Sequence, residues 1–91
     1  HYRAAVEDAR RALELYPLNP AGIVSLADVQ AAAGEALGSE KLMREALANY
    51  GEAFRLDDRR LPWETFHRLG TKTKDEIRAK IRRVEERLGQ A

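Results

Sequence analysis

The fold is decided by the stretch Ala5–Pro20, AVEDARRALELYPLNP. One narrow face of its first part carries small or apolar residues at helical spacing, which lets a second helix come close: Ala5, Ala9, Ala12 and Leu13. Pro17 ends this helix, because proline has no backbone N–H and disfavours the α conformation at Tyr16. Asn19 and Pro20 then suit the N-cap and first position of a new helix. The stretch therefore predicts a helix that ends just before Pro17 and a second helix that begins at Pro20.

The composition is typical of one soluble, mostly helical domain over residues 1–91, with 34% charged and 44% hydrophobic residues. A chain of this size buries roughly 60–65% of its unfolded surface, so we expect a modest core. The absence of cysteine excludes disulfides and thiolate chemistry and is compatible with any compartment. No apolar run approaches the roughly 18 residues that cross a bilayer, so we do not expect this segment to span a membrane.

The chain begins at His1, inside a predicted helix and without a methionine. A tag remnant or a cloned boundary would account for this start. We expect instead that the chain is the C-terminal piece of a longer protein, because the second helix of a hairpin has no reason to exist without the first.

Charge is unevenly distributed along the chain. Residues 1–58 carry a net charge of −4 and residues 59–91 carry +5. Such asymmetry can steer a partner or favour head-to-tail contact, although solvated helix faces produce it as well.

Helices are predicted over about residues 2–16, 20–37, 39–57, 62–69 and 73–88. Gly38 suits the left-handed residue that follows a helix, and Ser39 suits the next N-cap. The 39–57 helix has the widest apolar face, so we expect it to be the best-buried helix, with Met43 filling the core. Each glycine inside a helix costs roughly 1 kcal/mol relative to alanine. We therefore expect close helix contacts at three of them: Gly22, Gly34 and Gly51.

The C-terminal third is expected to cover the open end of the 20–37 and 39–57 pair. Asp57–Arg60 is expected to be a charged, solvated turn. The short helix that follows offers large apolar residues as a plug: Trp63, Phe66 and Leu69. The alternative left open is that Trp63 is an anchor for a binding partner.

The last predicted helix starts with a capping box at Thr73–Glu76 and runs to Leu88. A single thin apolar stripe follows its length: Ile77, Ile81, Val84 and Leu88. A helix with one narrow seam and solvated sides suits the outer cap of a stack of helices.

Two stretches repeat at an offset of 41 residues: Ala5-x3-Ala9-x2-Ala12-Leu13-x-Leu15 and Ala46-x3-Tyr50-x2-Ala53-Phe54-x-Leu56. This pattern, with Pro17 behind the first copy, resembles the tetratricopeptide repeat (TPR) family, whose period is about 34 residues. The surplus of about seven residues adds roughly one turn to each helix of a hairpin. The resemblance covers residues 2–58, one and a half repeats, and leaves 59–91 as a short helix plus a capping helix. It departs from the family at Asp58, which stands where the second closing proline belongs.

The resemblance implies an all-α fold of antiparallel helix hairpins in a fragment of a right-handed α-solenoid. Peptide ligands of this family lie on a concave face formed by the first helix of each hairpin. Carried over by position, that face would include five residues: Val24, Ser25, Asp28, Ala31 and Ala32. The family's chaperone-tail clamps use Lys, Arg and Asn, none of which stands at these positions, so such a role is disfavoured. The ending Leu61–Glu64 also resembles the degenerate repeats that end O-antigen ligase-like bacterial membrane proteins.

Catalytic chemistry is not indicated by the sequence. The only histidines are His1 and His67, and the paired acids are adjacent in sequence, so they do not face one another on a helix. No Gly-rich phosphate loop is present, and the serines and threonines have no partner base. We therefore expect no catalytic residues, no metal, no cofactor and no enzymatic activity.

Two functions remain. The first is a protein-interaction scaffold, a C-terminal segment of a larger protein that binds a protein or peptide. The alternative is binding of nucleic acid or an anionic surface through basic residues of the last helix: Lys74, Arg78, Lys80, Arg82, Arg83 and Arg87. Interleaved acids and the lack of aromatic residues for base stacking speak against it, so no nucleic acid is expected.

Self-association is also predicted. The first helix lacks its hairpin partner, so three of its residues are expected to leave an exposed apolar face for a second copy: Val6, Ala9 and Leu13.

Overall fold

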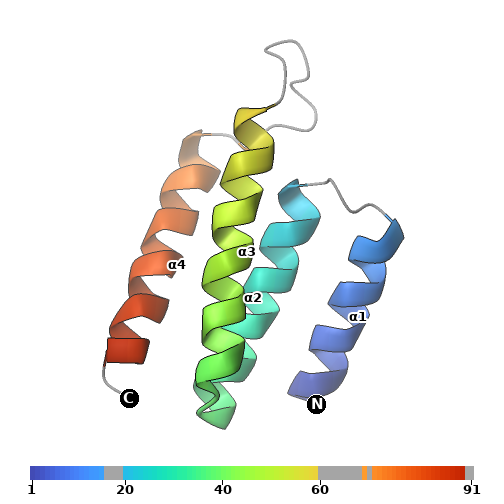
Figure 1. Cartoon of the computed structure of the whole chain (residues 1–91), viewed down its shortest axis with the longest axis vertical. Coiled ribbons are helices and arrows are strands. Elements are labelled where there is room, and N and C mark those ends of the chain that lie inside the picture. The colour runs from blue at the N-terminus through green and yellow to red at the C-terminus, as the bar shows by residue number, and fades with distance from the viewer. Residues whose placement is uncertain (16–19, 60–68, 70, 90–91) are drawn as a thin grey trace.

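The computed structural model describes residues 1–15, 20–59, 69 and 71–89. This part of the chain is all-α, as the sequence predicts (Figure 1). It contains four helices: α1 (Tyr2–Leu15), α2 (Pro20–Leu37), α3 (Glu40–Asp58) and α4 (Thr71–Gly89). None of these helices combines the length and the apolar content needed to cross a membrane. The short helix predicted over 62–69 lies outside the described residues, apart from Leu69.

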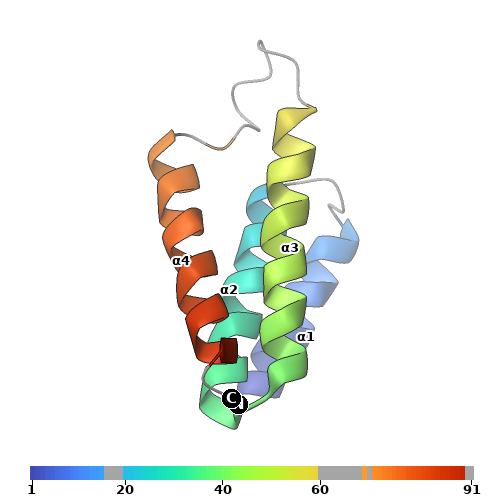
Figure 2. The same cartoon turned by 60° about the vertical axis from the view of Figure 1, so that its left-hand side comes forward.

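The helices run alternately in opposite directions, so α2 and α4 are parallel and α3 is antiparallel to both (Figures 1 and 2). α2 lies against α1 and α3, and α4 packs mainly on α3 while also reaching α2. The predicted hairpin of the second and third helices is therefore confirmed.

The turn between α2 and α3 forms as predicted. Gly38 has a φ of 65°, the left-handed conformation that glycine adopts without steric cost. Ser39 is the N-cap of α3, because its hydroxyl accepts a hydrogen bond from the Leu42 backbone N–H at 3.3 Å. Short-range chemistry thus makes α2 and α3 antiparallel neighbours.

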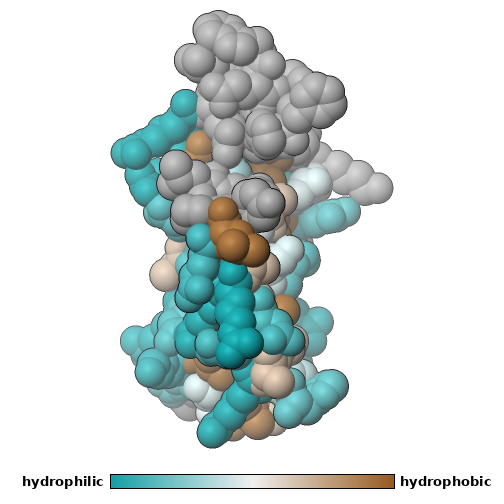
Figure 3. Space-filling model, turned by 90° about the vertical axis from the view of Figure 1, so that its right-hand side faces the viewer, coloured by the Kyte–Doolittle hydropathy of each residue, from teal (hydrophilic) through white to brown (hydrophobic). Residues whose placement is uncertain are grey.

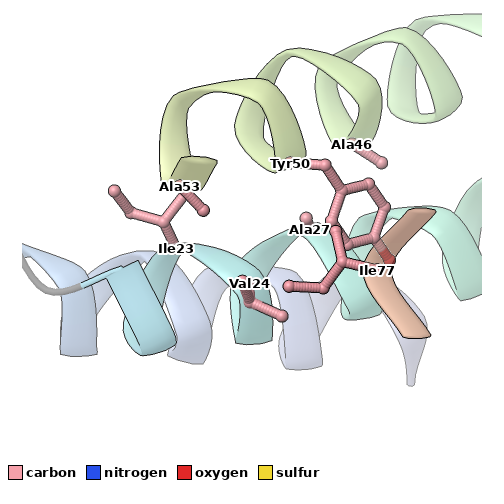
Figure 4. Packing of buried hydrophobic residues seen from close by; sticks show 7 residues of the cluster. All are labelled: Ile23, Val24, Ala27, Ala46, Tyr50, Ala53 and Ile77. Atoms are coloured by element: carbon pink, nitrogen blue, oxygen red, sulfur yellow. The ribbon is translucent and has the colours of Figure 1, made fainter. Parts of the chain in front are cut away.

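The main core lies between α2, α3 and α4 (Figure 4). Its buried members come from all three helices: Ile23, Val24, Ala27, Ala46, Tyr50, Ala53 and Ile77. Ala27 of α2 and Tyr50 of α3 both belong to this cluster. Alanines at three of the seven positions let the helix backbones approach closely and leave room for the Tyr50 ring.

The central helix is α2, and the prediction that the 39–57 helix is the best buried is wrong. α2 buries residues toward all of its neighbours, including Leu26 and Ala33 toward α1, whereas the buried residues of α3 follow one face. The physical reason is that α2 is apolar on most sides, and a helix of that kind is stable only when several neighbours cover it.

The face of α1 that was expected to be exposed is covered. Val6 is 5% exposed and packs with Leu26, and both Ala9 and Leu13 lie against the same cluster. The expectation that these residues form an exposed patch is therefore wrong, because α2 itself supplies their cover. Self-association stays a prediction, but these residues do not offer a free surface for it.

The other side of α1 faces away from the core. Figure 3 shows that the side of the molecule on which α1 lies is mainly hydrophilic, with a few hydrophobic residues between the polar ones. Tyr2 and Leu15 are the large hydrophobic residues of α1 that are exposed.

The apolar stripe of α4 faces the core as predicted. Ile77 and Val84 are 1% and 2% exposed, and Ile81 and Leu88 are half-buried. The start of this helix differs from the prediction. α4 begins at Thr71, so Thr73 lies inside the helix and is not its N-cap.

The end of α3 also differs from the predicted solvated turn. Asp57 is fully buried, although the sequence places it among charged neighbours. Its Oδ1 accepts the backbone N–H of Leu69 at 2.6 Å, and its Oδ2 lies 2.8 Å from the Lys74 ammonium. Leu69 also packs against the main core. Trp63 and Phe66, the other residues of the predicted plug, lie outside the described residues.

Of the close helix contacts predicted at glycines, the one at Gly34 is confirmed and the one at Gly51 is wrong. A Cβ at Gly34 would lie 2.6 Å from Met43 Cγ and 3.0 Å from the Met43 backbone nitrogen, so α2 and α3 do approach closely there. A Cβ at Gly51 would meet nothing within 4 Å, so the predicted close contact at this position is wrong.

These two glycines give a matched test of the α2–α3 contact. Gly34→Ala should lower the free energy of unfolding by about 1–2 kcal/mol, because overpacking outweighs the gain in helix propensity. Gly51→Ala should raise it by about 0.5–1 kcal/mol, since only the propensity changes. Urea denaturation of both variants beside the parent measures the difference. Equal stabilisation by the two substitutions would contradict the packing.

Candidate functional site

A groove of about 300 Å³ lies between the parallel helices α2 and α4. We call it the α2–α4 groove. It is lined by residues of both helices and by one from α3 beneath them: Asp28, Ala31, Ala32, Glu35, Tyr50, Lys80, Arg83 and Val84. Small side chains on α2 leave the space open, and ion pairs between α2 and α4 cross it.

Asp28 links three helices within the groove. Its Oδ1 accepts a hydrogen bond from the Tyr50 hydroxyl of α3 at 2.6 Å. The Lys80 ammonium of α4 donates to both oxygens of the same carboxylate at 3.1 Å. This carboxylate therefore holds α4 in register with the α2–α3 hairpin.

Burial raises the pKa of the Tyr50 hydroxyl above its ordinary value, and the hydrogen bond to Asp28 together with that carboxylate's charge raises it further. Tyr50 is 1% exposed and stays protonated at neutral pH. It acts as a hydrogen-bond donor in the core, and it does not provide a base or a nucleophile.

Glu35 makes the second connection between α2 and α4. Arg83 donates to both of its carboxylate oxygens, from Nε at 3.1 Å and from Nη2 at 3.2 Å. Arg87, one turn further along α4, has its Nε 3.9 Å from Glu35 Oε1. The arginine side chains remain more than half exposed, so they also face solvent at the rim of the groove.

The sequence-predicted concave face is brought only partly into this groove. Asp28, Ala31 and Ala32 line it. Val24 packs into the core and is 9% exposed. Ser25 is exposed but does not line the groove, and its hydroxyl donates to the Ala21 carbonyl at 3.1 Å.

The sequence analysis names Lys80 and Arg83 only as candidates for binding an anionic surface and Val84 only as part of the apolar stripe, and it does not predict that they line a groove with α2. A signal for them was present. Asp28 and Glu35 are the only charged residues of α2 and stand two helical turns apart, on one side of its apolar stripe. Lys80, Arg83 and Arg87 follow one side of the α4 stripe in the same way. If the apolar stripes of two parallel helices face each other, the carboxylates beside the α2 stripe lie opposite the cations beside the α4 stripe and can pair with them.

The basic cluster of α4 is largely engaged within the chain. Lys74 pairs with Asp57, while Lys80, Arg83 and Arg87 pair with carboxylates of α2. Arg78 pairs with Asp75 of its own helix and lies 5.3 Å from the centre of the Phe54 ring. This part of α4 is thus a docking surface for α2 and α3 more than a free cationic face.

A separate polar network joins α1, α2 and α3. Gln30 is 2% exposed, donates to Glu45 Oε2 at 3.0 Å and accepts from Asn49 at 2.7 Å. Arg10 of α1 donates to the same Glu45 oxygen at 3.0 Å. Because a buried amide is stable only with its partners in place, the network fixes the relative positions of these helices.

Within the described ranges, no group of three or more His, Asp or Glu side chains is placed to hold a metal ion. His67 lies outside these ranges.

Comparisons of the chain with protein-family models, with curated proteins and with solved structures gave no match.

The Lys74–Asp57 pair predicts a large effect of a single substitution. Lys74→Met should lower the free energy of unfolding by about 2 kcal/mol, because Asp57 is fully buried and would lose a cationic partner. The control Lys41→Met removes an exposed lysine of α3 and should change it by less than about 0.5 kcal/mol. Urea denaturation at neutral pH measures both, and equal effects would contradict the role of this pair.

Tyr50 predicts a loss of stability in alkali. The unfolded chain ionises its tyrosines near pH 10, whereas the raised pKa keeps folded Tyr50 protonated, so the free energy of unfolding should fall as the pH rises above about 10. Tyr50→Phe should reduce this fall relative to the parent, because it removes the buried hydroxyl. Denaturation at a series of pH values measures it. Identical pH profiles for the parent and Tyr50→Phe would count against the raised pKa.

Proposed function

We propose that this chain is a non-catalytic protein–protein interaction module of tetratricopeptide type, which binds a segment of a partner protein in the α2–α4 groove. The observation that carries the proposal is the groove itself. Its lining combines the small side chains of Ala31 and Ala32 with charged groups at the rim. Shallow grooves that offer small residues and a few oriented polar groups suit the recognition of peptides.

The arrangement of the helices supports the proposal. α2 and α4 are parallel and α3 is antiparallel to both, the relation expected for the first helices of successive hairpins (Figure 2). In this interpretation α1 is the second helix of one hairpin, and α2 and α3 are the two helices of the next hairpin. α4 corresponds to the first helix of a third hairpin. The whole would be a fragment of a right-handed α-solenoid, with the α2–α4 groove on its concave side.

The observations favour this function over binding of nucleic acid through α4. Four cationic residues of that helix already pair with carboxylates of α2 or α3: Lys74, Lys80, Arg83 and Arg87. Acidic residues also interrupt its remaining surface, including Asp75, Glu85 and Glu86.

A substitution that fills the groove tests the proposal. Peptides selected on the parent chain from a random-sequence display library should bind Ala32→Arg at least about tenfold more weakly, because the long side chain occupies the space above Ala31. Ala48→Arg places the same side chain at an exposed alanine of α3 and should leave binding unchanged. Fluorescence anisotropy with labelled peptides measures the affinities.

Both alanines are exposed, so neither substitution should change the free energy of unfolding by more than about 0.5 kcal/mol. If the selected peptides bind the parent and Ala32→Arg equally well, the groove is not the binding site and the proposal fails.

A further inference from the structure

The rim of the α2–α4 groove has an imbalance between donors and acceptors. On the α2 side, both carboxylates are occupied: Asp28 accepts from Tyr50 and Lys80, and Glu35 accepts from Arg83 on both oxygens. Glu35 has a second cationic neighbour in Arg87. Each carboxylate of the groove is therefore already neutralised by at least one cation of the same chain.

The α4 side has spare donors. A guanidinium carries more N–H groups than one carboxylate can accept, and Arg83 and Arg87 share the single carboxylate of Glu35. Their side chains are 65% and 53% exposed, so the unused N–H groups can reach a ligand from solvent. The local charge at this end of the groove is positive, because two guanidinium groups face one carboxylate.

The floor between the two ion pairs is apolar. Half-buried Ala31 and exposed Ala32 lie beside buried Val84 and Tyr50. Small side chains here leave space for one apolar side chain of a ligand, next to the cationic rim.

We propose that the occupant of the α2–α4 groove is an acidic segment of a partner protein, with carboxylate side chains on Arg83 and Arg87 and an apolar side chain on Ala31 and Ala32. This inference rests on the proposed function and names the chemistry of the partner. Carboxylates form paired, charge-assisted hydrogen bonds with guanidinium groups, which give geometric specificity as well as affinity. A basic segment would find both carboxylates of the groove already occupied.

The first test is the composition of peptides selected on the chain from a random display library. The peptides whose binding is lost in Ala32→Arg should be enriched in Asp and Glu and depleted in Lys and Arg. Enrichment of basic residues, or no charge preference, would overturn this inference while leaving the proposed function intact. A selection that yields no groove-dependent peptide would instead remove the proposed function, and this inference with it.

The second test is a double-mutant cycle with one selected peptide, amidated at its C-terminus so that every carboxylate belongs to a side chain. Replacing its Glu by Gln, or Arg83→Gln in the protein, should each weaken binding about tenfold, and both changes together should weaken it little more than either one. Fully multiplicative losses would show that the two groups do not meet, which would overturn the assignment.

Two further variants separate recognition from folding. Arg83→Lys keeps the charge but lacks the paired N–H donors of a guanidinium, so it should bind the peptide more weakly than the parent and more tightly than Arg83→Gln. Binding by Arg83→Lys as tight as that of the parent would contradict recognition through paired hydrogen bonds. Arg82→Gln removes the same charge from α4 at a residue that does not line the groove, and it should leave binding unchanged.

The competing occupant is a nucleic acid. A labelled DNA duplex should bind the parent far more weakly than the peptide, and equally well with Arg82→Gln and Arg83→Gln. Duplex binding at least as tight as that of the peptide, lost alike in both variants, would assign the cationic side of α4 to phosphates and overturn the proposal.

Discussion

The structure depends on the burial of one helix, α2. Its apolar residues are distributed around most of its circumference, so it is stable only where several neighbours exclude water from it. α1 covers Leu26 and Ala33, α3 covers Ala27, and α4 brings Ile77 to the remaining side. The positions of the three other helices follow from this requirement, because each offers a narrow apolar stripe that matches one side of α2.

The two charged residues of α2 determine how the last of these helices fits. Burial of Ile77 and Val84 contributes roughly 1.5–3 kcal/mol for each side chain. The partly exposed pairs of Lys80 with Asp28 and of Arg83 with Glu35 contribute less than this burial, because solvent screens their attraction. The apolar seam therefore holds α4 in place. The ion pairs determine the register of α4 along α2. Because they span the space over Ala31 and Ala32, they also form the charged rim of the α2–α4 groove.

The sequence predicts the elements and local contacts well, because helix signals are short-range. Gly38 and Ser39 form the predicted turn, and Gly34 lies at a close contact. The features that were not predicted from the sequence depend on tertiary packing. The helical period around Gly51 does not tell whether a neighbour is near. Nothing local shows that Asp57 is buried, since its cationic partner comes from α4. The groove was not predicted because its two walls are distant in sequence, although the charged residues of α2 and α4 follow matching sides of the two apolar stripes.

The cover of α2 by three helices can be measured through nuclear Overhauser contacts between side chains. We expect contacts from Val6 to Leu26, from the Tyr50 ring to Ala27, and from the Ile77 methyl groups to Val24 and the Tyr50 ring. Figure 4 shows the residues of the last two sets of contacts. Spectra that contain the first two contacts and lack every contact to Ile77 would contradict the account. In that case α4 would not be docked on α2, and the α2–α4 groove would not exist.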